Sequence, residues 1–144
     1  MAVTLYMYTS SMHDGLNGSV DWDSGNIYMG LLTAYTPDLD AHTTWTQAKA
    51  GGTEHSTANG YTAGGKTVGT TTHAMGTGTG ITLFGSPNVV WTATTTLTAA
   101  YAVVFNTSTD ALVCYIDFGG NVSATGAAFT VDTSNGHFSI DAQP

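Results

Sequence analysis

The chain has 144 residues, of which 42% are hydrophobic and only 8% are charged, and its formal net charge is -8. This length predicts one domain spanning residues 1–144, since domains most often hold about 100–150 residues. Lys49 and Lys66 are the only basic side chains, beside ten carboxylates. Because nucleic acids and anionic lipid surfaces are bound mainly through clustered cations, we expect neither as a partner.

The lengths of the apolar runs and the single cysteine indicate the compartment in which the protein is made. The longest nearly apolar run, Leu97–Phe105, is far shorter than the ~20 residues of a membrane-spanning helix. No Lys or Arg precedes Lys49, so we expect no secretory signal peptide. Cys114 lies in the apolar run Ala111–Phe118. We expect a buried, unreactive thiol and synthesis in a reducing cytosol.

Threonine and glycine take the place of charged residues, with 27 threonines and 18 glycines in the chain. Threonine favours strands because its branched Cβ suits a pleated surface, and its hydroxyl group keeps an exposed face hydrated. The composition therefore predicts an all-β fold. We expect an antiparallel β-sandwich, or a barrel-like pair of sheets, with long Gly/Thr-rich loops and one or two short helical turns.

The first third of the chain predicts one clear strand. Ala2–Tyr8 fits a strand or the first turn of a short helix, and Thr9–Gly18 fits a loop with one helical turn. Asp21–Asn26 has turn composition. Asn26–Leu32 then alternates as a strand does, with Ile27, Met29 and Leu31 on one face.

The segment from Pro37 to Gly80 predicts mostly connections. Asp40 is expected to cap a short helix over Ala41–Lys49. Gly51–Gly65 is expected to be a loop, Lys66–Thr72 a strand, and His73–Gly80 a flexible crossing.

The second half is more regular and predicts six strands: Ile81–Phe84, Asn88–Thr92, Thr98–Asn106, Ala111–Phe118, Ala127–Asp132 and His137–Asp141. The turn Asn106–Asp110 separates the two most apolar of them and predicts an antiparallel hairpin. Both faces of these two strands are apolar, with Leu112, Cys114, Ile116 and Phe118 expected on one face of the second. Such strands lie in the centre of a sheet that is covered on both sides.

The candidate catalytic and metal-binding patterns are weak. The histidines (His13, His42, His55, His73 and His137) lack metal-ligand spacing and are expected at the surface. The pairs Asp21/Asp23 and Asp38/Asp40 are expected to serve turns and helix caps rather than calcium. Gly76–Gly80 resembles a phosphate loop but lacks its Lys-Ser/Thr ending. We therefore expect no enzyme, catalytic residue, metal or cofactor. The remaining enzymatic alternative is a small hydrolase centred on His13, Asp14 or Glu54.

The aromatic residues offer a binding alternative. Trp91, Tyr101 and Tyr115 lie in apolar strands and are expected in the core. Trp45 lies in a loop region, and we expect it to be exposed to a sugar ring or a partner protein. A carbohydrate-binding module built around Trp45 therefore stays open.

Six segments carry a resemblance that covers nearly the whole chain in consistent order: Ile27–Asp40 (IYMGLLTAYTPDLD), Gly60–Val68 (GYTAGGKTV), Val89–Thr92 (VVWT), Ala100–Phe105 (AYAVVF), Tyr115–Gly119 (YIDFG) and Ala128–Ile140 (AFTVDTSNGHFSI). Together they resemble a family of small virion structural proteins of tailed bacteriophages, several of which resemble capsid decoration (cement) proteins. The chain departs from that family by lacking basic residues before its first strand and by having NTSTD in place of a charged turn. No interface residue is therefore transferred.

The resemblance implies a capsid decoration protein on the outer surface of the virion head, produced in the host cytoplasm. Its expected partners are the major capsid protein and further copies of itself, as a homotrimer at threefold positions of the lattice. The alternatives are a tail, head–tail connector or receptor-contacting fibre component of the virion.

Overall fold

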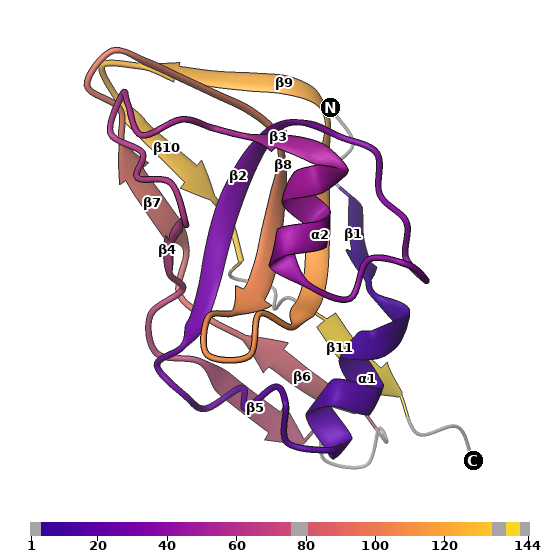
Figure 1. The fold of residues 1–144 in the computed structure, drawn as a ribbon. Coiled ribbons are helices and arrows are strands. Elements are labelled where there is room, and N and C mark those ends of the chain that lie inside the picture. The colour runs from indigo at the N-terminus through magenta and orange to yellow at the C-terminus, as the bar shows by residue number, and fades with distance from the viewer. Residues whose placement is uncertain (1–3, 76–80, 134–137, 142–144) are drawn as a thin grey trace.

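The computed structural model describes residues 4–75, 81–133 and 138–141. Within them the chain forms antiparallel strands and two short helices (Figure 1), as follows: β1 (Thr4–Met7), α1 (Thr9–Leu16), β2 (Ile27–Tyr35), α2 (Trp45–Ala50), β3 (Gly52–Glu54), β4 (Lys66–Thr67), β5 (Thr72–Met75), β6 (Ile81–Gly85), β7 (Val89–Thr92), β8 (Thr96–Asn106), β9 (Leu112–Thr125), β10 (Ala128–Val131) and β11 (Phe138–Asp141). The prediction of an all-β, antiparallel fold is confirmed.

The strands form one large sheet and two small ones. The large sheet has the order β1-β9-β8-β2-β3, with β4 also paired to β2. β10 pairs with β7, and β6 lies between β11 and β5. The strand pairings between described residues are all antiparallel, and no sheet in this part of the chain closes on itself. A simple sandwich of two sheets is therefore not confirmed.

The predicted hairpin of β8 and β9 is confirmed at the centre of the large sheet. Its turn is closed by the Asn106 amide, which donates to the Ala111 carbonyl at 2.8 Å. The Asn106 side chain accepts from the amides of Ser108 and Thr109. Asp110 takes the left-handed conformation at φ 62°. Local side-chain hydrogen bonds of this kind stabilise a tight turn.

Apolar clusters cover both faces of this central pair, as predicted. One face contributes Ala102, Val104 and Ile116 to a large core shared with β7, β10 and Phe84 of β6. The other face contributes Val103, Phe105 and Tyr115 to a second core beneath α2. Leu112 was expected beside Cys114, but it belongs to the second core. The register shift between Val104 and Phe105 inserts one residue in β9 and turns Leu112 to the opposite face.

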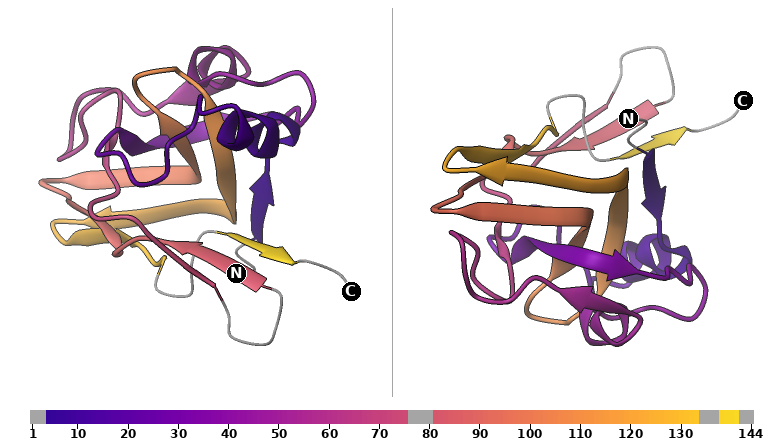
Figure 2. Two further views of the ribbon diagram at one scale, coloured as in Figure 1. Left: turned by 90° about the horizontal axis from the view of Figure 1, so that it is seen from below. Right: turned by 90° about the horizontal axis from the view of Figure 1, so that it is seen from above.

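The β8–β9 hairpin bends sharply partway along its length (Figure 2), and residues on both sides of the bend, such as Leu97 and Val104, belong to the large core. The bend lies at the register shift between Ala99 and Tyr101, across from Gly119 and Gly120. These glycines have φ angles of 75° and 142°, which residues other than glycine rarely adopt. Beyond the bend, β9 continues to Thr125, past the predicted end at Phe118. Leu97, fully buried on the distal arm, packs into the large core.

The helix after Pro37 begins later than predicted. Thr44, not Asp40, is its N-cap: the Thr44 hydroxyl accepts from the Gln47 amide, and the Gln47 side chain accepts from the Thr44 amide. This reciprocal capping box satisfies backbone donors that Asp40 is too far away to reach. Asp40 instead accepts a hydrogen bond from the Thr9 hydroxyl.

Several boundaries also differ from the predictions. Thr9–Leu16 is a two-turn helix rather than a loop with one turn. The expected loop Gly51–Gly65 begins with β3, which pairs with β2. The expected strand Lys66–Thr72 is divided into β4 and β5, and His73–Met75 completes β5. The expected crossing at residues 76–80, and His137, lie outside the described residues. In the part that is described, no helix is long and apolar enough to cross a membrane.

Candidate functional site

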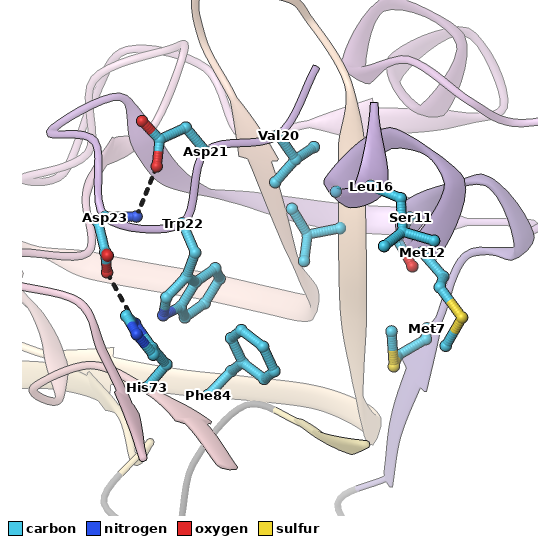
Figure 3. A pocket seen from close by; sticks show the side chains of 12 residues that line it. Met7, Ser11, Met12, Leu16, Val20, Asp21, Trp22, Asp23, His73 and Phe84 are labelled. Carbon is cyan, nitrogen blue, oxygen red and sulfur yellow. Dashed lines mark hydrogen bonds and ion pairs between the residues drawn. The ribbon is translucent and has the colours of Figure 1, made fainter. Parts of the chain in front are cut away.

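An apolar groove lies between helix α1 and the strands β5 and β6, and it has a volume of about 350 Å³. We call it the α1 groove. Figure 3 shows Trp22 and Phe84 on one side of it and Met7 and Met12 on the other. Val113 of β9 also lines the groove, and only 1% of this residue is exposed to solvent. A volume of this size falls in the range of pockets that hold ligands or partner side chains.

The wall formed by Trp22 is fixed from several directions. The Trp22 indole N–H donates to the Thr72 carbonyl at 3.0 Å, and the Thr71 hydroxyl donates to the Trp22 carbonyl. The ring of Phe84 meets the indole edge-on, with 6.0 Å between centroids. The groove wall is therefore a packed part of the fold.

The segment that leads from α1 to Trp22 is also held in place. The Asn17 amide donates to the His13 carbonyl, and the Val20 amide donates to the Asp14 carbonyl. The Thr109 hydroxyl, from the β8–β9 turn, donates to the Ser19 carbonyl at 2.6 Å. These bonds connect the groove to the central hairpin, so its walls keep a defined separation.

Helix α1 exposes its largest apolar side chains at the mouth of the groove. Met12 is 50% exposed and Leu16 is 86% exposed. Residues four apart lie on the same helix face, so the two side chains form one apolar edge. Ser11, which also lines the groove, is buried, and its hydroxyl donates to the Tyr8 carbonyl. Contiguous exposed apolar side chains bordered by polar groups are typical of a docking surface.

The border of the groove carries carboxylates. Asp21 and Asp23 line it, and the Asp21 carboxylate accepts from the Asp23 amide. Asp23 also pairs with His73 Nδ1 at 3.1 Å. Asp14 lies next to the lining residue Gly15 and pairs with His13 Nδ1 at 3.2 Å. Lys49 and Lys66 lie elsewhere, on α2 and β4. Two carboxylates line this border and both lysines lie on other elements, which gives the border an acidic character.

The residues proposed for a hydrolase are not gathered into one site. His13 and Asp14 do pair, but the His13 side chain is 77% exposed. Glu54 is occupied elsewhere: its carboxylate accepts from the Tyr61 hydroxyl at 2.9 Å and from the Gly64 amide at 2.5 Å. Glu54 thus anchors the 55–65 loop. Among the residues described, no group of three or more His, Cys, Asp or Glu side chains could hold a metal ion.

The other predicted site residues have local structural contacts. His42 is only partly exposed: its Nδ1 atom lies 3.0 Å from the Tyr35 hydroxyl and accepts from the Asp38 amide. Asp38 serves a turn as predicted, accepting from the Asp40 and Ala41 amides, which lowers the pKa of its carboxyl group. His55 Nδ1 lies 2.7 Å from the Ser56 carbonyl.

Cys114 is fully buried, as predicted. Burial raises the pKa of its thiol well above the usual range, because the charged thiolate would be desolvated. At neutral pH the group is therefore a protonated and protected thiol.

The prediction that Trp45 is exposed is wrong. Trp45 is 4% exposed and stacks on Phe105 with ring centroids 4.5 Å apart and planes 7° apart. The indole covers Gly30, where a Cβ atom would lie 2.7 Å from Trp45 Cη2. The T-x-x-Q pattern from Thr44 to Gln47 places Trp45 in the first turn of a helix, and this signal was available in the sequence. The carbohydrate-binding alternative therefore loses the residue on which it depended.

Sequence reasoning did not predict the α1 groove. Its lining comes from β1, α1, residues 20–23, β5, β6 and β9, which are far apart in the chain. The one local signal was the pair of apolar residues Met12 and Leu16 at helical spacing.

Comparisons with known proteins do not assign this chain to a family. No family model, curated protein or solved structure matches this chain.

Proposed function

We propose that this protein is a structural component of a tailed-bacteriophage virion that decorates the outer surface of the capsid and stabilises it. The observation that carries the proposal is the resemblance of six segments, in consistent order, to small virion structural proteins. The antiparallel scaffold and the apolar groove among the described residues support the proposal, because docking onto a protein lattice needs a firm framework and an apolar contact surface.

The mechanism of stabilisation is multivalent contact. Each copy bridges adjacent subunits of the major capsid protein, most simply as a homotrimer at a threefold position. When one contact of such a copy has formed, the others become intramolecular, and many modest contacts give strong retention. The sparsely charged, threonine-rich surface suits this role, because burying few ions between copies avoids desolvation costs of several kcal/mol per ion.

The decisive experiment is to locate and count the protein in purified particles. Quantitative mass spectrometry of separated heads and tails is expected to find the chain in the head fraction at hundreds of copies per particle. Particles that lack it should release their genome at a lower temperature or lower osmotic stress. Recovery in the tail fraction, or at a few dozen copies or fewer, would instead support the tail, connector or fibre alternative.

A further inference from the structure

We infer that the α1 groove binds a polypeptide segment that presents large apolar side chains next to lysine or arginine. This inference rests on the proposed function only where it identifies the segment as part of a neighbouring virion protein. The binding chemistry itself follows from the groove.

The apolar part of the recognition comes from the groove and from α1. Met12 and Leu16 are exposed at its mouth, and Trp22 and Phe84 form a fixed wall behind them. An apolar side chain seated there would gain contact with both sides. Methionines at the mouth adapt to different shapes, since the thioether side chain is flexible and polarisable.

The basic part of the recognition comes from charge complementarity. Asp21 and Asp23 line the groove, whereas both lysines lie on other elements, α2 and β4. The whole chain carries a charge of -8, which would attract a basic partner over a distance of about a Debye length. A segment with Lys or Arg beside its apolar anchor therefore fits both features.

A second copy of the chain fits less well. To match the acidic border it would have to present a lysine, and both of its lysines are engaged elsewhere: Lys66 Nζ donates to the Val90 carbonyl at 2.7 Å, and Lys49 Nζ lies 5.5 Å from the centroid of Trp45. The partner is therefore expected to be a different, basic polypeptide.

The test measures binding of defined peptides to the intact protein by fluorescence anisotropy. The probe is a fluorescent 14-residue peptide of leucine and lysine with leucines at helical spacing, and the matched probe has glutamate in place of every lysine. We expect the leucine–lysine peptide to bind and its affinity to fall as salt is added. The leucine–glutamate peptide should not bind.

Variants locate the binding. Leu16→Gln removes an exposed apolar group without changing charge and should weaken binding roughly fivefold or more, whereas Val90→Gln, on β7, should change it less than about twofold. The double variant Asp21→Asn/Asp23→Asn should weaken binding roughly threefold at low salt. Asp117→Asn, on β9 and outside the groove lining, removes one charge and should have less effect than Asp21→Asn or Asp23→Asn alone. Thermal melting verifies that each variant is folded.

Three outcomes would overturn the inference: equal binding of both peptides, equal weakening by the groove and control variants, or a self-associated state that Leu16→Gln dissociates. The last result would assign the groove to a second copy. The outcome is separate from that of the particle experiment. If the protein is abundant in heads but its groove fails the peptide tests, only the inference about the groove is refuted. If the groove binds the basic peptide but the protein is absent from heads, only the proposed function is refuted.

Discussion

Replacing Trp45 with alanine is expected to destabilise the fold severely. The indole is 4% exposed, and its stack with Phe105 forms the centre of the second core. A buried aromatic side chain removes about 150–250 Å² from water, which at about 25 cal/mol per Å² gives roughly 4–6 kcal/mol as an upper estimate. Tryptophan-to-alanine changes in cores cost about 3–5 kcal/mol. We therefore expect a loss of about 4 kcal/mol in the free energy of unfolding.

The measurement is urea and thermal unfolding followed by far-UV circular dichroism. A loss of this size should lower the midpoint of thermal unfolding by about 10–15 °C in a chain of this length. Leu16→Ala is the matched control: its side chain is 86% exposed, so its free energy of unfolding should change by less than about 0.5 kcal/mol. If Trp45→Ala costs under about 1.5 kcal/mol, the reasoning about this core is refuted. An exposed sugar-binding tryptophan would give that smaller value.

Three further predictions concern backbone geometry, alkaline pH and thiol protection. Gly65 has φ 73°, and a Cβ atom there would lie 2.2 Å from the Met29 carbonyl oxygen, whereas Gly64 at φ 94° has open space. Gly65→Ala should therefore cost more than about 2 kcal/mol in a denaturant titration and Gly64→Ala about 1 kcal/mol; equal losses would show that the contact with β2 is unimportant. Burial raises the pKa of the Tyr115 hydroxyl to about 12, whereas its pKa in the unfolded chain is about 10. Below pH 10 the hydroxyl is protonated in both states; between pH 10 and 12 it loses its proton mainly in the unfolded state, so the free energy of unfolding falls as pH rises. Tyr115→Phe should flatten the loss of stability between pH 10 and 12, and an unchanged pH profile would contradict this assignment. Cys114 should react with an aromatic disulfide reagent only as fast as the protein opens, so complete labelling within seconds in native buffer, without acceleration by urea, would disprove its burial.

The sequence predicted the elements whose pattern is dictated by burial. β2, β8 and the first part of β9 alternate or are apolar on both faces because they lie in the centre of a covered sheet, and this pattern is visible without a structure. The extension of β9 was missed because Gly119 and Gly120 normally end a strand. Here their freedom at positive φ allows the strand to bend and continue.

Helix α1 and the groove could not be predicted in the same way. Serine, histidine, aspartate and glycine in Thr9–Leu16 are modest helix formers. The largest apolar residues of this helix, Met12 and Leu16, face solvent instead of the core, so no buried helical period is present. The groove depends on contacts between distant segments, and a single sequence does not reveal which of them meet. Trp45 was a different failure, because its capping box was readable from Thr44 and Gln47.

The order of the large sheet has a consequence for how the chain reaches its native state. Thr4 pairs with Asp117 and Met7 with Cys114, so the first strand finds its neighbour only after most of the polypeptide has left the ribosome. Contacts between such distant residues require closure of a very long loop and slow the search. Until then β1 has no partner strand, and its backbone groups stay open to pairing with other nascent chains. Production of the protein in large amounts should therefore benefit from temperatures and chaperones that keep incompletely paired sheets from associating.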